Sequence, residues 1–331
     1  MRAWRVGALG EPRDVLELSA VAALGEPGPG LLRLQVSAAG IGRPDLFMCQ
    51  GSYALTPPLP FTPGQEAVGV VTAVGEGARA RVGDRRMAVT AFFAGHGSFA
   101  EECLALDDFA LPVPEGMSDA EAAGFLIPFH TAYVGLVRRA GLRAGENLLV
   151  LGAAGGTGSA ALQLGAALGA RVIASAGGPE KGAFCSGLGA DVVVDYRSQD
   201  IAEAVREATA GAGADVVYDA VGGEAFRAAT HCIAHEGRLL VVGFGSGQWG
   251  QPSAAHLVTH NYSLLGVMPG GYDRAFKEAA QSVLAEHWRA GRLRVPLSDV
   301  VDFEALPTAL EELAAGSVTG KLALAVATRP G

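Results

Sequence analysis

The chain has 331 residues, of which half are hydrophobic, 18% are charged and 47 are glycine. This length suggests about two domains, and the apolar content excludes a disordered chain. The formal net charge of −9, without long basic runs, excludes bulk binding to nucleic acid or to an anionic membrane surface. The composition still permits a local basic pocket for a small phosphate-bearing ligand.

Cysteine usage and the N-terminal residues suggest a location. Cys49, Cys103, Cys185 and Cys232 are far apart and form no Cys-x-x-Cys pair, which favours reduced thiols in a cytoplasmic protein. The N-terminus has no apolar segment typical of a secretory signal. The uncharged stretch from Asn147 to Ala170 is long enough to span a bilayer, but its glycines favour a strand, a turn and a helix. We expect a cytoplasmic protein without a membrane segment.

The first part of the chain reads as strands and turns. Residues 31–36 and 68–74 are apolar or alternating runs of strand length. Four prolines between residues 57 and 63 exclude regular structure from one loop. Residues 1 to about 120 therefore predict a mainly β domain.

From about residue 147 apolar strands alternate with helical segments. We expect strands over 148–151, 171–175, 191–195, 215–218, 238–242 and 263–267, and helices over 157–168, 180–188, 201–209 and 225–234. This alternation predicts a doubly wound parallel sheet. The tail is expected to form a helix over 273–290, a strand near Val300, a helix over 305–314 and a strand over 321–326. If the tail closes back on the first domain, that domain is discontinuous.

A glycine-rich turn follows the first strand of this second region. Gly155, Gly156, Thr157 and Gly158 lie where the strand gives way to a helix. Glycines there allow a tight turn and a close approach of backbone N–H groups to a pyrophosphate, and the helix N-terminus adds positive charge. Because the turn lies in a βαβ unit, it predicts a dinucleotide site; the alternative is a packing turn without a ligand.

The end of the second strand indicates which dinucleotide binds. An NAD site usually carries a carboxylate there, but this strand ends in Ser175, Ala176 and Gly177, and Lys181 follows on the next helix. A missing carboxylate removes repulsion against a 2′-phosphate, and a lysine can pair with one. The pattern favours NADP(H), with a solvated surface lysine as the alternative interpretation of Lys181.

These motifs resemble the zinc-free quinone oxidoreductase branch of the medium-chain dehydrogenase/reductases. The run over 145–158 followed by Gln163 is similar to the branch signature, although Ala166 departs from its usual end. Residues 63–69 and 82–85 resemble landmarks of the catalytic domain. The resemblance covers nearly the whole chain. It implies an α/β protein with a GroES-like, mainly β catalytic domain and a doubly wound Rossmann domain.

The resemblance also implies boundaries and an assembly. The catalytic domain is expected over 1–122 and 268–331, and the Rossmann domain over 123–267. Gly320-Lys321-Leu322 resembles the start of the family's C-terminal strand. The family often dimerises by pairing the last strands of two Rossmann sheets, so we expect a homodimer.

The resemblance assigns roles to particular residues. Near the adenine-side phosphate it implies Lys181 and Tyr196, with Arg197 as an additional contact. Phe244 and Gly245 are expected along the nicotinamide. The remaining expected site residues are Lys321 at the cofactor, Tyr53 and Thr131 as catalytic residues, and Gly42, His130 and Met268 in the substrate pocket.

No zinc site is expected. Zinc-dependent relatives place Cys, His and Cys around the metal, and the matching positions here are Gly42, Gln65 and Ile127, which supply no thiolate or imidazole. The four-cysteine structural lobe is also missing. Two histidine pairs at helical i,i+4 spacing, His231/His235 and His256/His260, have no third ligand nearby in sequence, so we interpret them as surface or core histidines.

Without a Lewis acid, the chemistry favours acceptors that spread charge after a hydride arrives, such as quinones or α,β-unsaturated carbonyls. Tyr53, in a segment resembling one in enoyl-thioester reductases, is the candidate hydrogen-bond donor to the acceptor oxygen. The leading hypothesis is an NADPH-dependent quinone reductase, since no basic cluster that would anchor a long thioester stands out. The alternatives are an enoyl-thioester or enone reductase of fatty-acid or secondary metabolism, and a non-catalytic NADPH-binding protein.

Overall fold

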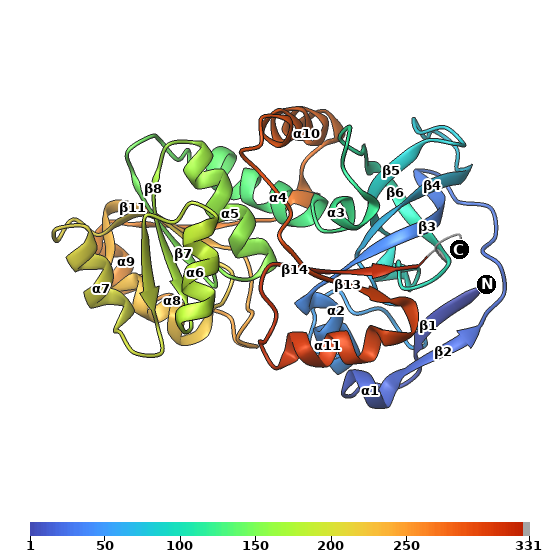
Figure 1. Cartoon of the computed structure of the whole chain (residues 1–331), viewed down its shortest axis with the longest axis horizontal. Coiled ribbons are helices and arrows are strands. Elements are labelled where there is room, and N and C mark those ends of the chain that lie inside the picture. The colour runs from blue at the N-terminus through green and yellow to red at the C-terminus, as the bar shows by residue number, and fades with distance from the viewer. Residues whose placement is uncertain (327–331) are drawn as a thin grey trace. The chain divides into compact units, whose positions relative to one another are not determined.

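The computed structural model describes residues 1–326, which divide into two compact units (Figure 1). Among the described residues, unit 1 consists of 1–127, 272–281 and 295–326; unit 2 consists of 128–271 and 282–294. The mainly β unit is thus built from both ends of the chain. Residues 282–294, which we had assigned to the first domain, group with the second unit.

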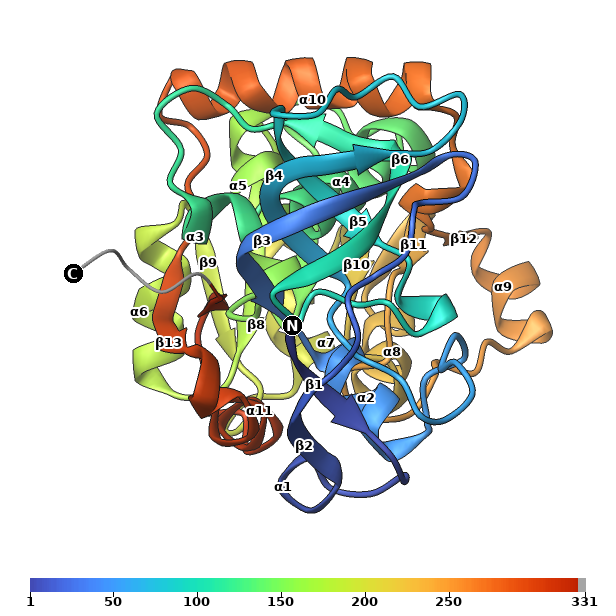
Figure 2. The ribbon, with the colours of Figure 1, turned by 90° about the vertical axis from the view of Figure 1, so that its right-hand side faces the viewer.

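Unit 1 is organised around one curled, mainly antiparallel sheet (Figure 2). Its strands run in the order β13 (Leu297–Asp302), β14 (Lys321–Ala325), β3 (Leu31–Ile41), β4 (Glu66–Val74), β5 (Arg85–Thr90) and β6 (Glu102–Pro112). Because β3 pairs with both β4 and β6, these strands wrap around a common core. The C-terminal strand β14 pairs antiparallel with β3, which ties the two ends of the chain into one unit.

Several smaller elements of unit 1 have sequences too short or too irregular to be predicted. The helix that follows β3 is an example, because glycine and proline surround its first residues. These elements are β1 (Arg2–Val6), α1 (Pro12–Val15), β2 (Leu16–Ala20), α2 (Arg43–Gln50) and α3 (Asp119–Ala123). The expected tail helix is present as α11 (Leu306–Ala314).

Unit 2 contains a six-stranded sheet in which all neighbouring strands are parallel. The order is β12 (Ser263–Gly266), β11 (Ile233–Val241), β10 (Ala214–Asp219), β7 (Asn147–Leu151), β8 (Arg171–Ala176) and β9 (Val192–Asp195). The chain starts at β7 and proceeds first to β8 and β9, then back to β10. The strand order therefore reverses at β7, the point at which such sheets bind ligands.

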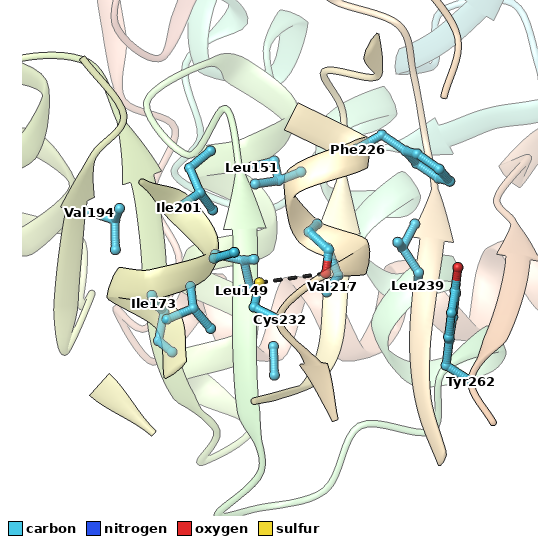
Figure 3. Packing of buried hydrophobic residues seen from close by; sticks show 14 residues of the cluster. Leu149, Leu151, Ile173, Val194, Ile201, Val217, Phe226, Cys232, Leu239 and Tyr262 are labelled. Carbon is cyan, nitrogen blue, oxygen red and sulfur yellow. Dashed lines mark hydrogen bonds between the residues drawn. The ribbon is translucent and has the colours of Figure 1, made fainter. Parts of the chain in front are cut away.

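Along the chain, the helices of unit 2 alternate with its strands, as the sequence predicted. They are α5 (Gly156–Ala167), α6 (Pro179–Gly187), α7 (Ile201–Ala208) and α8 (Gly223–Thr230); α4 (Leu126–Tyr133) and α10 (Arg274–Arg289) each contain residues of both units. Apolar side chains of the central strands, such as Leu149, Ile173 and Val217, form one cluster with Ile201 and Phe226 from the helices (Figure 3). This core fixes the ends of the strands, from which the functional loops extend.

The helical i,i+4 spacing of the two histidine pairs corresponds to a shared helix in only one of them. Helix α8 ends at Thr230 because β11 already begins at Ile233, so His231 and His235 do not share a helix. His256 and His260 do share one, the unexpected α9 (Ala254–His260), where their rings stack with centroids 3.9 Å apart. Within residues 1–326 we find no helix that is long and apolar enough to cross a membrane.

Candidate functional site

The glycine-rich turn of unit 2 is built by steric constraints that only glycine satisfies. Gly152, directly after β7, has a φ of +64°, and the Gly155 N–H donates to the Gly152 carbonyl at 3.0 Å. A Cβ at Gly158 would lie 2.2 Å from that same carbonyl oxygen, so the first turn of α5 can approach the strand only without a side chain. The N-terminus of a 12-residue helix is thereby exposed to a ligand at the strand reversal.

A second cluster lies at the adjacent ends of β8 and β9. Tyr196 and Arg197 lie over Gly177, where an added Cβ would be 2.6 Å from the Tyr196 hydroxyl and 3.0 Å from the Arg197 Nε. The Asp195 carboxylate accepts from the N–H groups of Gly178 and Arg197 at 2.9 and 3.0 Å, and these bonds lower its pKa. Gly177, Tyr196 and Arg197 therefore lie close together, and the nearby Asp195 carboxylate is already hydrogen-bonded to backbone N–H groups.

Ser175 and Lys181 flank this second cluster. Ser175, in β8, is buried, and its carbonyl accepts from the Ala153 N–H of the glycine-rich turn at 3.1 Å. Lys181 lies in the first turn of α6 and is half-buried. Arg197, which the sequence suggested only as an additional contact, also lies close to the next glycine, because a Cβ at Gly178 would lie 3.3 Å from its Nη1.

The loops after β10 and β11 complete this edge of the sheet. The Asp219 carboxylate ends β10 and accepts from the N–H groups of Val221 and Gly222. The Gly245 N–H donates to the Ala220 carbonyl at 3.0 Å, which holds the two loops side by side. Phe244 is nearly buried and stacks on Trp249, a tryptophan that the sequence analysis did not consider.

The candidate catalytic tyrosine of unit 1 lies in a loop just after α2. Tyr53 is half-buried, and its ring packs at 6.3 Å from that of Phe92. Burial raises the pKa of its hydroxyl, a hydrogen bond with the Gln65 side chain lowers it, and the Asp45 carboxyl raises it. Tyr53 is thus brought together with Gln65, one of the three positions that match zinc ligands in relatives.

A buried charged cluster lies beside this tyrosine. The Lys321 ammonium pairs with the Glu66 carboxylate at 2.8 Å, and both side chains are less than a tenth exposed. The other Glu66 oxygen accepts from the Ile127 N–H at 2.8 Å. Asp45, in the first turn of α2, accepts from the Gly42 N–H at 2.9 Å. The sequence did not indicate Asp45 or Glu66 as site residues, because nothing in their local sequence predicts that these carboxyl groups are buried.

The remaining expected residues are less informative. Lys321, expected at the cofactor, is instead occupied by the buried pair with Glu66 in unit 1. His130 and Thr131 are buried on α4 in unit 2, and Met268 is exposed after β12. Gly42 caps the start of α2, where an added Cβ would lie 3.3 Å from the Pro44 Cδ.

The residues at the zinc-matching positions do not fit a catalytic zinc. Gly42, Gln65 and Ile127 offer no thiolate or imidazole, and Gln65 is directed to the Met48 sulfur and to Tyr53. Across residues 1–326 no three His, Cys, Asp or Glu side chains form a group able to hold a metal. The four cysteines are buried, and burial raises the pKa of each thiol.

Comparisons with known proteins agree with this architecture. Residues 28–115 match the alcohol dehydrogenase GroES-like domain family, and residues 156–285 match the zinc-binding dehydrogenase family. The chain is 34% identical over 287 residues to the quinone oxidoreductase-like protein 2 homolog of Nematostella vectensis, covering 85% of this chain and 77% of the relative.

Two solved structures share the whole fold. A probable oxidoreductase from Mycobacterium abscessus is 37% identical with a TM-score of 0.85, covering 98% of each chain. Escherichia coli quinone oxidoreductase complexed with NADPH is 25% identical with a TM-score of 0.87, covering 98% of this chain and 100% of the other. The chain is therefore an oxidoreductase that belongs to the quinone oxidoreductase branch of the medium-chain dehydrogenase/reductases.

Proposed function

We propose that this oxidoreductase is a zinc-independent NADPH:quinone reductase. The observation that carries the cofactor assignment is the cluster at the ends of β8 and β9, where Tyr196 and Arg197 lie over Gly177. No carboxylate ends β8, and the nearby Asp195 is engaged by backbone N–H groups. A 2′-phosphate would meet guanidinium and ammonium groups there instead of a competing acid.

The glycine-rich turn supports binding of the rest of the dinucleotide. The N-terminus of α5 offers backbone N–H groups and positive charge to a pyrophosphate, and Gly158 permits the necessary close approach. When bound, the nicotinamide supplies a hydride to the acceptor. Phe244 and Gly245, held against the loop after β10, are proposed to line that end of the cofactor.

Unit 1 supplies the groups that would handle the acceptor. A quinone that receives a hydride develops negative charge on an oxygen, which a neutral hydroxyl donor stabilises and can protonate. Tyr53 is such a donor, because burial keeps its pKa above the usual value and the hydroxyl protonated. Since no zinc ligands face this place, an alcohol or its alkoxide would lack the Lewis acid that it needs.

We also propose that the protein is a homodimer. Strand β12 is at the edge of the unit 2 sheet and carries unpaired backbone groups, which a second copy of the strand could pair. Size-exclusion chromatography with light scattering tests this assembly: a monomer at micromolar concentration would contradict it.

The function is tested by following NADPH oxidation by the purified, chelator-treated protein. A simple quinone and a short enoyl-CoA are the paired acceptors, and NADH replaces NADPH in the control. We expect fast turnover of the quinone with NADPH, slower turnover with NADH, and little reduction of the enoyl-CoA. Faster reduction of the enoyl-CoA would replace the quinone assignment with an enoyl reductase. Cofactor binding without turnover of either acceptor would refute the proposed activity.

A further inference from the structure

A buried carboxyl group on α2, the helix just before the loop of Tyr53, acts electrostatically on this tyrosine. Asp45 is only 2% exposed, and one of its oxygens accepts from the Gly42 N–H at 2.9 Å. Its other oxygen is buried and makes no well-formed hydrogen bond in the described chain, although the Gly64 N–H acts on the carboxyl and lowers its pKa. A carboxylate with an unpaired oxygen in such surroundings is costly, whereas a carboxylic acid is tolerated.

The charges around Asp45 also favour a protonated carboxyl group. Two carboxyl groups, those of Asp45 and Glu66, share their surroundings with one ammonium group, that of Lys321. The ammonium is paired with Glu66 at 2.8 Å. A Cβ at Gly42 would lie 3.7 Å from the Asp45 carboxyl and 4.0 Å from the Lys321 Nζ, so Asp45 and the ammonium partner of Glu66 flank the same glycine. The cluster is neutral as a whole only if Asp45 holds its proton.

The titration of Asp45 then falls in the physiological range. Burial raises the pKa of Asp45 to about 7, against the opposing effects of the Gly42 N–H and the Lys321 ammonium. Ionised Asp45 raises the pKa of Tyr53, whose hydroxyl bonds to Gln65, the neighbour of Glu66 in sequence. A negative charge behind Tyr53 makes this hydroxyl a weaker proton donor and opposes negative charge on an acceptor oxygen nearby.

We propose that Asp45 is a positioning residue of the reductase site, and that its protonated carboxyl keeps the Tyr53 hydroxyl effective as a donor to the reduced acceptor. This inference rests on the proposed function. The acceptor takes a hydride from NADPH, its oxygen takes the proton as the Tyr53 O–H bond breaks, and the tyrosinate regains a proton from solvent. Asp45 gives up no proton in this cycle. Its ionisation lowers turnover in mildly alkaline solution.

The test compares the pH dependence of kcat for the wild type and two variants. Asp45→Asn keeps an oxygen for the Gly42 N–H but cannot ionise. Glu121→Gln is the matched control, because the Glu121 carboxylate accepts from the Ser118 N–H at 3.0 Å at the same position of helix α3, where it is exposed. We expect wild-type kcat to fall at least about threefold between pH 6 and 8.5, with KM for NADPH unchanged.

The Glu121→Gln variant should follow the wild type, while Asp45→Asn should lose the decrease and keep its acid-side rate. Asp45→Ser, which also retains an oxygen acceptor, replaces the Asn variant if that one does not fold. Infrared difference spectra of wild type against variant provide a readout independent of turnover. A carboxylic acid C=O band assigned to Asp45 should be present at pH 6 and disappear with a midpoint near pH 7.

The possible results separate the two proposals. If the wild type turns over but kcat of Asp45→Asn shows the same alkaline decrease, the role of Asp45 alone is overturned. Absence of an Asp45 carboxylic acid band at pH 6 has the same consequence. Absence of turnover by the wild type with every quinone overturns the proposed function, and the role of Asp45 in it falls as well.

Discussion

Replacing Asp45 by asparagine should make the protein more stable, by an amount that grows with pH. The pKa of this carboxyl is raised from 3.8 to about 7 in the folded protein. Between these values the folded state holds a proton that the unfolded chain has released, so stability falls as pH rises. About three pKa units at 1.36 kcal/mol each amount to about 4 kcal/mol, reached above pH 7. Below pH 4 Asp45 is protonated in both the folded and the unfolded state, so it no longer lowers the free energy of unfolding.

Urea unfolding of the wild type and of Asp45→Asn at several pH values measures this difference. The variant should gain about 3 kcal/mol over the wild type between pH 5 and pH 8, because part of the cost is already present at pH 5. Glu121→Gln, whose hydrogen bond with Ser118 is exposed to solvent, should show no comparable trend. A difference between wild type and Asp45→Asn that stays constant over this range would show that Asp45 titrates normally, and would refute the argument from burial.

Three further predictions concern the cofactor and the tyrosine. Lys181→Ala and Arg197→Ala should each weaken NADPH binding at least about tenfold and leave NADH binding nearly unchanged, as measured by fluorescence titration; equal losses for both cofactors would contradict a 2′-phosphate site. Tyr53→Phe should lower kcat at least about tenfold at an unchanged KM for NADPH, and an unaltered rate in steady-state assays would remove Tyr53 from the chemistry. Gly158→Ala places a methyl group 2.2 Å from the Gly152 carbonyl oxygen, so it should cost about 1–3 kcal/mol in thermal or urea unfolding and abolish NADPH binding; normal binding would show that the turn tolerates a side chain.

The sequence by itself determined most strands and helices of unit 2 and its glycine-rich turn. Strands such as β7 and β8 appear within one or two residues of where the apolar runs predicted them, and the turn lies between β7 and α5. Both signals are local, since a strand or a glycine turn is encoded by neighbours within about ten residues. The family and its two-domain organisation followed from these motifs.

The elements that the sequence missed are those in which tertiary contacts outweigh local pattern. Helix α2 begins among a glycine, an arginine and a proline, and Asp45 supports its first turn by accepting from the Gly42 N–H. The sequence predicted a helix over 225–234, but Ile233 and Ala234 lie in β11, where Ile233 pairs with Ala214. Sheet pairing with a distant strand therefore overrode the local helical preference.

Only the tertiary structure decided the electrostatics of the candidate site. Lys321 pairs with Glu66 across 255 residues of chain, so an expected cofactor residue became part of a buried ion pair. Arg197 became a stronger candidate for the proposed 2′-phosphate contact because folding places it over Gly177 and Gly178. The protonation of Asp45 depends on burial by several segments at once. Residue type and spacing are read along the chain, whereas burial and charge pairing arise between residues that are distant in sequence.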